Sequence, residues 1–114
     1  MGGDASDRAD LLQGTLELLV LRTLAGGDWK HGYAIADWIR GASAQALSIE
    51  EGALYPALHR MEVRGLLRSD WRRSENNRRA KYYTLTAQGR RRLTETTESW
   101  RRTSTAINRV LAAT

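Results

Sequence analysis

The sequence predicts a mainly α-helical domain that carries one small β-hairpin and continues into a single long C-terminal helix. Apolar residues recur at helical spacing in four stretches, while two short stretches around a polar turn have strand character. Glycine or a polar turn separates most of these stretches. At 114 residues, the chain is long enough for one modest core but not for a deep internal cleft.

The basic residues gather in the middle of the chain. Residues 60–92 contain eleven Lys and Arg against three Asp and Glu, a local net charge of +8, whereas the remainder has seven against ten, a net of −3. A basic middle between acidic flanks is the charge pattern of a nucleic-acid-binding surface. The alternative is an arginine-rich face that is merely solvated.

Several function classes lack the residues they need. There is no cysteine, which excludes disulfides, thiolate metal sites and cysteine nucleophiles. The two histidines, the absence of a carboxylate cluster with metal spacing and the absence of a phosphate-binding glycine loop argue against an enzyme, a metal site or a cofactor. With no signal peptide and no apolar run of about 20 residues, we expect a cytoplasmic protein that does not enter a membrane.

The N-terminal part of the chain is expected to form a tail and two helices. Residues 1–9 are small and polar, which predicts a disordered tail, and a wide apolar stripe over about residues 10–25 predicts a largely buried helix. A second helix is expected over about residues 31–40, ending at Gly41. Residues 46–49 are too few for more than a single strand rung before the next helix.

The third helix, in residues 48–64, has the features of a DNA-reading helix. Ser48 and Glu51 have capping-box spacing, and Gly65 is expected to end the helix. One face is apolar, and the other carries small or hydrogen-bonding side chains with no carboxylate. The apolar positions are Leu54, Leu58 and Met61; the outer positions are Gly52, Tyr55, His59 and, on the flank, Arg60. An apolar back and a groove-compatible front suit insertion into the major groove.

A hairpin follows directly. Residues 66–73 and 81–86 are expected to pair around a turn at residues 74–79, in which Asn76 and Asn77 tolerate positive φ. The predicted order is helix, helix, short strand, helix, hairpin. This order is that of a winged helix-turn-helix DNA-binding domain, here spanning residues 10–86, whose hairpin wing touches the DNA backbone.

The last helix, within residues 87–114 and capped by Thr86, predicts dimerisation. Leu93, Trp100 and Ile107 are spaced by seven residues, and a weaker column lies four residues after each of them. A small domain cannot bury such a seam alone, so we expect a homodimer. The alternative is a helix that folds back on its own domain.

Specific side chains are candidates for each contact. Tyrosine, histidine and arginine can hydrogen-bond to phosphates or base edges, and a helix N-terminus favours phosphate. The candidate DNA-binding residues are Tyr55, Pro56, His59 and Arg60 of the third helix, Arg78, Arg79 and Lys81 at the wing tip, and Lys30, His31 and Tyr33 at the start of the second helix. Packing alone is the alternative for Tyr55, and simple surface exposure for His59.

The position of Trp100 in the last helix allows two interpretations. At the centre of a dimer seam, two copies of its ring could enclose an apolar slot for a small planar hydrophobic effector. The candidate residues of this dimer and effector pocket are Leu12, Leu93, Trp100, Ile107 and Leu111. In the other reading, Trp100 only fills the dimer core.

Four segments together resemble the PadR family of bacterial transcriptional regulators. They are LLQGTLELLVLRTLAGG, HGYAIADWI, EEGALYPALHRMEVRGLL and NNRRAKYYTLTAQG, in the order and spacing of the family over about residues 11–112. The single terminal helix is similar to the short subfamily, and the stretches GALYPALHRMEVRGLLRSDW and SENNRRAKYY are similar to an acidobacterial-type subgroup. Ala53 and Val63 depart from the more usual polar residues at their positions.

The resemblance implies a homodimeric repressor on a palindromic, inverted-repeat operator, often released by a small molecule, and hence a protein held on the bacterial nucleoid by its operator. Two alternatives stay open. A sequence-non-specific architectural protein would use the same basic surface without a preferred site, and an effector-independent interaction module would use the Trp100 seam to bind another protein.

Overall fold

The computed structural model describes residues 13–114, which form helices and one small three-stranded antiparallel sheet. In chain order the elements are α2 (Gln13–Thr23), β1 (Lys30–His31), α3 (Gly32–Ala42), α4 (Glu51–Val63), β2 (Leu67–Arg73), β3 (Arg79–Leu85) and α5 (Ala87–Ala112). The predicted winged-helix fold is confirmed. The expectations for the tail and for Leu12 lie outside the described residues. Across residues 13–114, no helix has the length and apolar character needed to cross a membrane.

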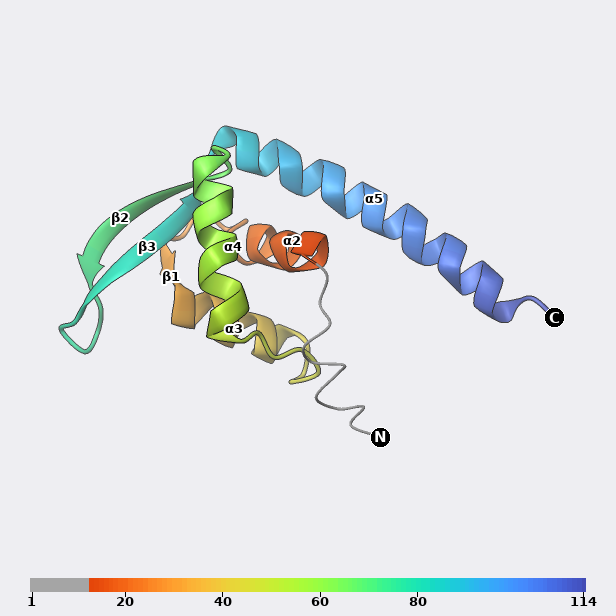
Figure 1. Ribbon diagram of the computed structural model, residues 1–114, viewed down its shortest axis with the longest axis horizontal. Coiled ribbons are helices and arrows are strands. Elements are labelled where there is room, and N and C mark those ends of the chain that lie inside the picture. The colour runs from red at the N-terminus through yellow and green to blue at the C-terminus, as the bar shows by residue number, and fades with distance from the viewer. Residues whose placement is uncertain (1–12) are drawn as a thin grey trace.

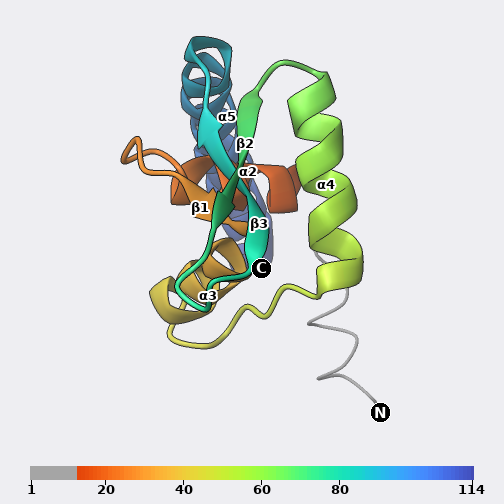
Figure 2. The same cartoon turned by 90° about the vertical axis from the view of Figure 1, so that its left-hand side faces the viewer.

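The helices α2, α3 and α4 enclose the core, and two elements extend from it. Figure 1 shows the β2–β3 hairpin projecting on one side and α5 leading away on the other. The apolar face of α4 is fully buried in the core, with Leu54, Ala57, Leu58 and Met61 each at most 1% exposed. The periodicity of this helix therefore identified its buried face correctly. Figure 2 shows that α4 lies at one edge of the molecule, beside the wing.

The three strands are ordered β1-β3-β2 and all pairs are antiparallel. The hairpin register runs from Leu67 opposite Leu85 to Arg73 opposite Arg79, and Asn77 in the turn has φ 58°. The strand rung predicted at residues 46–49 is wrong, because this segment has no regular structure. The short strand is instead β1, which pairs with β3 just before α3. A two-residue strand has no alternation to read, so only its partner defines it.

Two predicted helix signals are also wrong. The N-cap of α4 is Glu50, which makes no side-chain cap hydrogen bond, so Ser48 lies too far from the first turn to cap it. Gly41 lies inside α3, whose C-cap is Ser43. These errors have one physical reason: several residues near each end satisfy the local capping pattern, and the packing of the helix selects the actual boundary.

Two other helix ends lie where the sequence predicts them, at Gly65 and at Thr86. Gly65 has φ +80°, and the Leu66 N–H donates to the Met61 carbonyl over 2.9 Å, which forms the glycine-dependent end expected for α4. The Thr86 hydroxyl accepts a hydrogen bond from the Gly89 N–H over 3.0 Å and so caps α5. Both residues lie where the chain turns sharply, between α4 and β2 and between β3 and α5.

The two ends of α5 have different surroundings. Near its start, the helix packs on α2, and Leu93 contacts the core. Farther along, Trp100 and Ile107 are about half exposed, and Val110 and Leu111 are 73% and 76% exposed. In Figure 1 this outer part extends beyond the body of the described domain. Its apolar side chains therefore remain uncovered by residues 13–114.

A candidate nucleic-acid interface

The front of α4 presents a shallow, mostly uncharged surface. Tyr55, Pro56, His59 and Val63 are all exposed along it. Pro56 lies in the interior of the helix and has no N–H to donate to the helix turn before it, although α4 remains a single helix. Pro56 and His59 share the face that DNA would meet.

Tyr55 joins α4 to the start of α3. Its ring packs so closely on Gly32 that a Cβ atom there would lie 2.5 Å from the Tyr55 Cε1 atom. Burial, reinforced by the nearby Glu51 carboxylate, raises the pKa of the Tyr55 hydroxyl. The hydroxyl therefore stays protonated at neutral pH and keeps a proton to donate to an acceptor such as phosphate. Tyr55 both packs and offers a polar group.

Arg60 lies on the flank of α4 rather than on its front. It is half-buried, and its Nε atom has no hydrogen-bond partner among the described residues. One helical turn later on the same flank, Arg64 donates to Glu17 of α2 over 2.9 Å. This flank therefore carries one arginine that is paired with α2 and one, Arg60, that is only partly exposed.

The opposite flank of α4 binds the wing. The Ser69 hydroxyl donates to Glu62 over 2.5 Å, and the Lys81 ammonium lies 3.1 Å from the other oxygen of the same carboxylate. The Ser69 hydrogen bond is the main cause of a lowered pKa of Glu62, and Lys81 adds to it, while partial burial opposes the shift. This three-residue cluster fixes the wing to α4.

The cluster places Lys81 differently from its predicted position at the wing tip. Lys81 lies inside β3, opposite Trp71, with its ammonium directed to α4. Arg78 belongs to the turn and Arg79 begins β3, and both are exposed, in line with the prediction for the tip. One of the three basic residues is thus already paired within the protein.

A groove of about 910 Å³ runs between the wing and the start of α3. Aromatic and basic side chains dominate its walls, and Asp37 and Glu75 contribute the acidic ones. The lining residues are His31, Gly32, Tyr33, Ala34, Asp37, Tyr55, Trp71, Ser74, Glu75, Asn76, Arg78, Arg79, Ala80, Lys81 and Tyr83. The structure therefore brings together six of the ten predicted DNA-binding residues around one groove. Pro56, His59, Arg60 and Lys30 do not line it.

The start of α3 contributes a partly engaged histidine. The Ala34 N–H donates to His31 Nδ1 over 3.2 Å, so His31 caps the helix, and its ring meets the edge of Tyr82 at a centroid distance of 5.1 Å. A ring that accepts at Nδ1 carries its proton on Nε2, which is the atom left for an acceptor. Tyr33, 64% exposed, is the most accessible aromatic residue of the groove, whereas Lys30 is half-buried in β1.

Trp71 is a groove residue that the sequence reasoning missed. It is 54% exposed, and the Arg79 guanidinium lies 4.8 Å from the centre of its ring. Alternation along the hairpin was a usable signal: Trp71 pairs with Lys81, so both share a face with Arg79, two residues away in β3. On the other face of the hairpin, Arg72 stacks on Trp29 at 4.3 Å.

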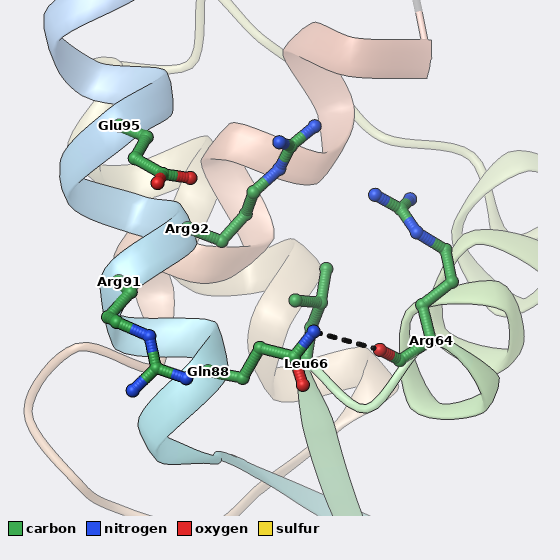
Figure 3. A pocket seen from close by; sticks show the side chains of 6 residues that line it. All are labelled: Arg64, Leu66, Gln88, Arg91, Arg92 and Glu95. Atoms are coloured by element: carbon green, nitrogen blue, oxygen red, sulfur yellow. Dashed lines mark hydrogen bonds between the residues drawn. The ribbon is translucent and has the colours of Figure 1, made fainter.

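A second basic pocket, of about 340 Å³, lies at the C-terminal end of α4, where α5 begins. Figure 3 shows its lining residues, Arg64, Leu66, Gln88, Arg91, Arg92 and Glu95, with the Gln88 amide donating to the Arg64 carbonyl over 3.5 Å. Arg64 is engaged by Glu17, and the Glu95 carboxylate shares the pocket with Arg91 and Arg92. This pocket is separate from the groove, at the other end of α4 from Tyr55.

The predicted dimer and effector residues occupy three different environments. Trp100 lines a depression of about 310 Å³ between α2 and α5, together with Gly14, Thr15, Leu18, Thr96, Ser99 and Thr103. Leu93 instead packs against the core of its own chain. Ile107 and Leu111 lie farther out on α5, exposed. Trp100 thus lines the depression between α2 and α5, whereas Leu93, Ile107 and Leu111 are not among its lining residues.

Comparison with known proteins agrees with this geometry. Residues 20–95 match the model of a family described as transcriptional regulator PadR-like. The chain is similar to a transcriptional regulator from Clostridium thermocellum (29% identity, 88% of this chain and 96% of that chain, TM-score 0.77). It is similar to a PadR-like transcriptional regulator from Bacillus cereus (28% identity, 90% of this chain and 97% of that chain, TM-score 0.73). It is also similar to a PadR family regulator from Eggerthella lenta (32% identity, 89% of this chain and 85% of that chain, TM-score 0.73).

Proposed function

The chain belongs to the PadR-like family of transcriptional regulators, and on this premise we propose that it represses transcription as a homodimer bound to an inverted-repeat operator. It is a DNA-binding regulator rather than a member of an enzyme family. The observation that carries the proposal is the joined pair of DNA-facing elements: the front of α4 and the wing, held together by Glu62, Ser69 and Lys81.

The wing supplies most of the charge that this proposal requires. Arg78 and Arg79 are exposed at its tip, whereas the front of α4 offers Tyr55 and His59 and no exposed arginine. Phosphate neutralisation by arginine gives affinity, and polar contacts of the helix with base edges give sequence choice. We expect the wing to provide most of the affinity and α4 to set the register and part of the sequence preference.

The uncovered part of α5 supports the homodimer in this proposal. Residues 10–86 act as the DNA-binding domain in this proposal, and residues 87–114 carry the dimer contacts. Trp100, Ile107 and Leu111 leave a row of apolar surface on the outer helix, which a second copy can cover by symmetry. A dimer also gives two copies of Tyr55 a fixed separation, as an inverted repeat requires.

The proposal also includes release of the protein from DNA by a small effector. The depression between α2 and α5 has one flat aromatic wall, Trp100, and small side chains around it. A second copy of α5 would close its open side, so a small planar hydrophobic compound could stack on Trp100. Trp100→Ala should abolish the effect of such a compound on DNA binding; an unchanged response would exclude this site.

The decisive experiment is selection of bound duplexes from a random DNA pool, followed by titration of the selected and a scrambled duplex. We expect a palindromic consensus and binding that weakens steeply with salt. Arg79→Ala should lower the slope of log K against log salt by about 0.9. Arg102→Ala removes an exposed arginine of α5 that faces away from the apolar row and serves as the control. Equal affinity for both duplexes at physiological salt would overturn the proposal in favour of an architectural protein.

A further inference from the structure

Two arginines of the wing are stacked on tryptophans, one on each face of the hairpin. Arg79 lies 4.8 Å from the ring centre of Trp71, and Arg72 lies 4.3 Å from that of Trp29. Such contacts attract a guanidinium to the negative face of an aromatic ring. The two contacts have similar distances, but only the one between Arg79 and Trp71 lines the groove between the wing and α3.

The stack in the groove has an open outer side. Trp71 is 54% exposed, and the described residues contain no acidic partner within ion-pair distance of Arg79. Lys81, the neighbouring cation of the same strand face, is held by Glu62. Arg72, by contrast, pairs with Asp70 at 3.3 Å on the far face. Arg79 is therefore ordered by a ring that leaves its donors free.

From this difference we propose that Trp71 is a positioning residue for DNA binding, which acts by holding the Arg79 guanidinium in the groove before DNA arrives. The inference rests on the proposed function as a DNA-binding regulator. A free arginine loses rotamer freedom when it binds a phosphate, and a side chain that is already ordered loses less. Planar stacking suits arginine in particular, because the flat face packs on the ring while the edge keeps its N–H donors.

The test is a double-mutant cycle measured on the duplex selected from the random pool. Trp71→Ala should weaken binding by about three- to fivefold, the value of an exposed cation–π contact. In the Arg79→Ala background, the same change should have little further effect, because the group that Trp71 positions is gone. Equal losses in both backgrounds would show that Trp71 contacts DNA itself, and would overturn the proposal.

Salt dependence separates positioning from loss of charge. Arg79→Ala removes a phosphate contact and should reduce the salt slope by about 0.9. Trp71→Ala keeps the charge, so its affinity should fall with a slope close to that of the unmodified protein. A slope reduced as much as in Arg79→Ala would mean that the contact itself is lost, which contradicts a purely positioning role.

Two further variants control for folding. Trp71→Phe keeps an aromatic face and should recover most of the affinity lost in Trp71→Ala. A loss of affinity caused by disturbed folding at this site would not be recovered in this way with an unchanged salt slope. Trp29→Ala removes the matched stack from the far face and should change affinity less than twofold. An effect of Trp29→Ala as large as that of Trp71→Ala would indicate general disturbance of the wing and overturn the proposal. Absence of duplex binding by the unmodified protein would overturn the proposed function together with this inference.

Discussion

The wing and the outer part of α5, residues 100–112, both extend from the body of the domain, yet they relate to it differently. The wing is held by contacts within the chain: Ser69 and Lys81 to Glu62, and Thr84 across β3 to the Gly27 carbonyl. The outer part of α5 presents Ile107, Val110 and Leu111 to solvent. A polar wing tip can stay exposed to solvent in a single chain, whereas an exposed row of apolar side chains indicates a surface that another molecule covers.

The difference indicates separate roles for the two regions, DNA binding for the wing and assembly for the outer part of α5. A surface that meets DNA gains from being ordered in advance, because less freedom is lost on binding. A surface that meets a second copy of the chain can remain uncovered until assembly, since the partner supplies its packing. On this view, a substitution in the outer part of α5 should affect assembly without affecting the fold of the DNA-facing unit, and a substitution near Tyr55 should do the reverse.

The largest effect is expected from Ile107→Glu. Half of Ile107 is exposed in the single chain, so the domain should keep its fold, while a charge in the apolar row should prevent dimerisation. Loss of the second half-site should then lower affinity for the selected palindrome by about a hundredfold or more. Sedimentation velocity gives the assembly state, and duplex titration gives the affinity.

Thr105→Glu is the matched control for this prediction. Thr105 is exposed on the same helix, away from the row that contains Ile107, and the same charge there should leave the dimer intact. A dimeric Ile107→Glu protein with unchanged affinity would remove the distinction between the two regions.

A smaller effect is expected from Gly32→Ala, which addresses the DNA-facing unit. The new methyl group would meet the Tyr55 ring, and the ring can move aside, so stability should fall by about 1 kcal/mol while affinity for the palindrome falls by about tenfold. Chemical denaturation and duplex titration measure the two quantities. The dimer should be unaffected.

The same helix provides the control. A Cβ atom at Gly41 would meet nothing within 4 Å, and Gly41 lies inside α3, so Gly41→Ala should stabilise the protein by up to about 1 kcal/mol. If Gly32→Ala bound DNA as well as Gly41→Ala, the close packing of Tyr55 on α3 would have no role in binding.

The smallest effect is expected from Glu62→Gln, which tests the link between α4 and the wing. The pKa of Glu62 is lowered in the folded protein, so its charged form contributes stability above its unfolded pKa, about 4.3, and this contribution is lost as pH falls through the lower folded pKa. At pH 7 the substitution should cost about 1 kcal/mol. The difference from the unmodified protein should shrink below about pH 4.

Denaturation at several pH values measures this difference, with Asp70→Asn as the control. Asp70 pairs with Arg72 on the exposed face of the wing, where its side chain is 58% exposed, so its replacement should change stability by less than about 0.5 kcal/mol. A pH-independent cost for Glu62→Gln would show that its charge does not contribute to holding the wing.

Much of the fold could be predicted because periodic patterns report burial directly. The buried face of α4, the hairpin with its turn at Asn77, the cap at Thr86 and the glycine end at Gly65 all depend on nearby residues. The prediction was wrong where alternatives were locally equivalent. Ser48 and Gly41 each fit a helix boundary, and the rung at residues 46–49 was as plausible as the strand that formed at Lys30–His31.

The composition of the groove could be predicted in part. The exposed arginines at the tip and the tyrosines at the helix starts were found from residue type and position. The pairing of Lys81 with Glu62 was not found, because it depends on how β3 packs against a separate element, α4. Trp71 was also missed, although the alternation of the hairpin places it on the same face as Arg79. Arg60 was expected on the flank of α4, and it lies there half-buried, one turn before the arginine that pairs with Glu17 of α2.

By itself, the sequence determined which surfaces are apolar, where the chain turns and where positive charge accumulates, because these depend on the side chains and on the periods of helix and strand. Only the tertiary structure decided which charges remain available. Lys81 and Arg64 are engaged by Glu62 and Glu17, whereas Arg79 rests on Trp71 with its donors free. The physical reason is that an ion pair or a stack requires two groups within a few ångströms, and that distance is set by how separate elements pack.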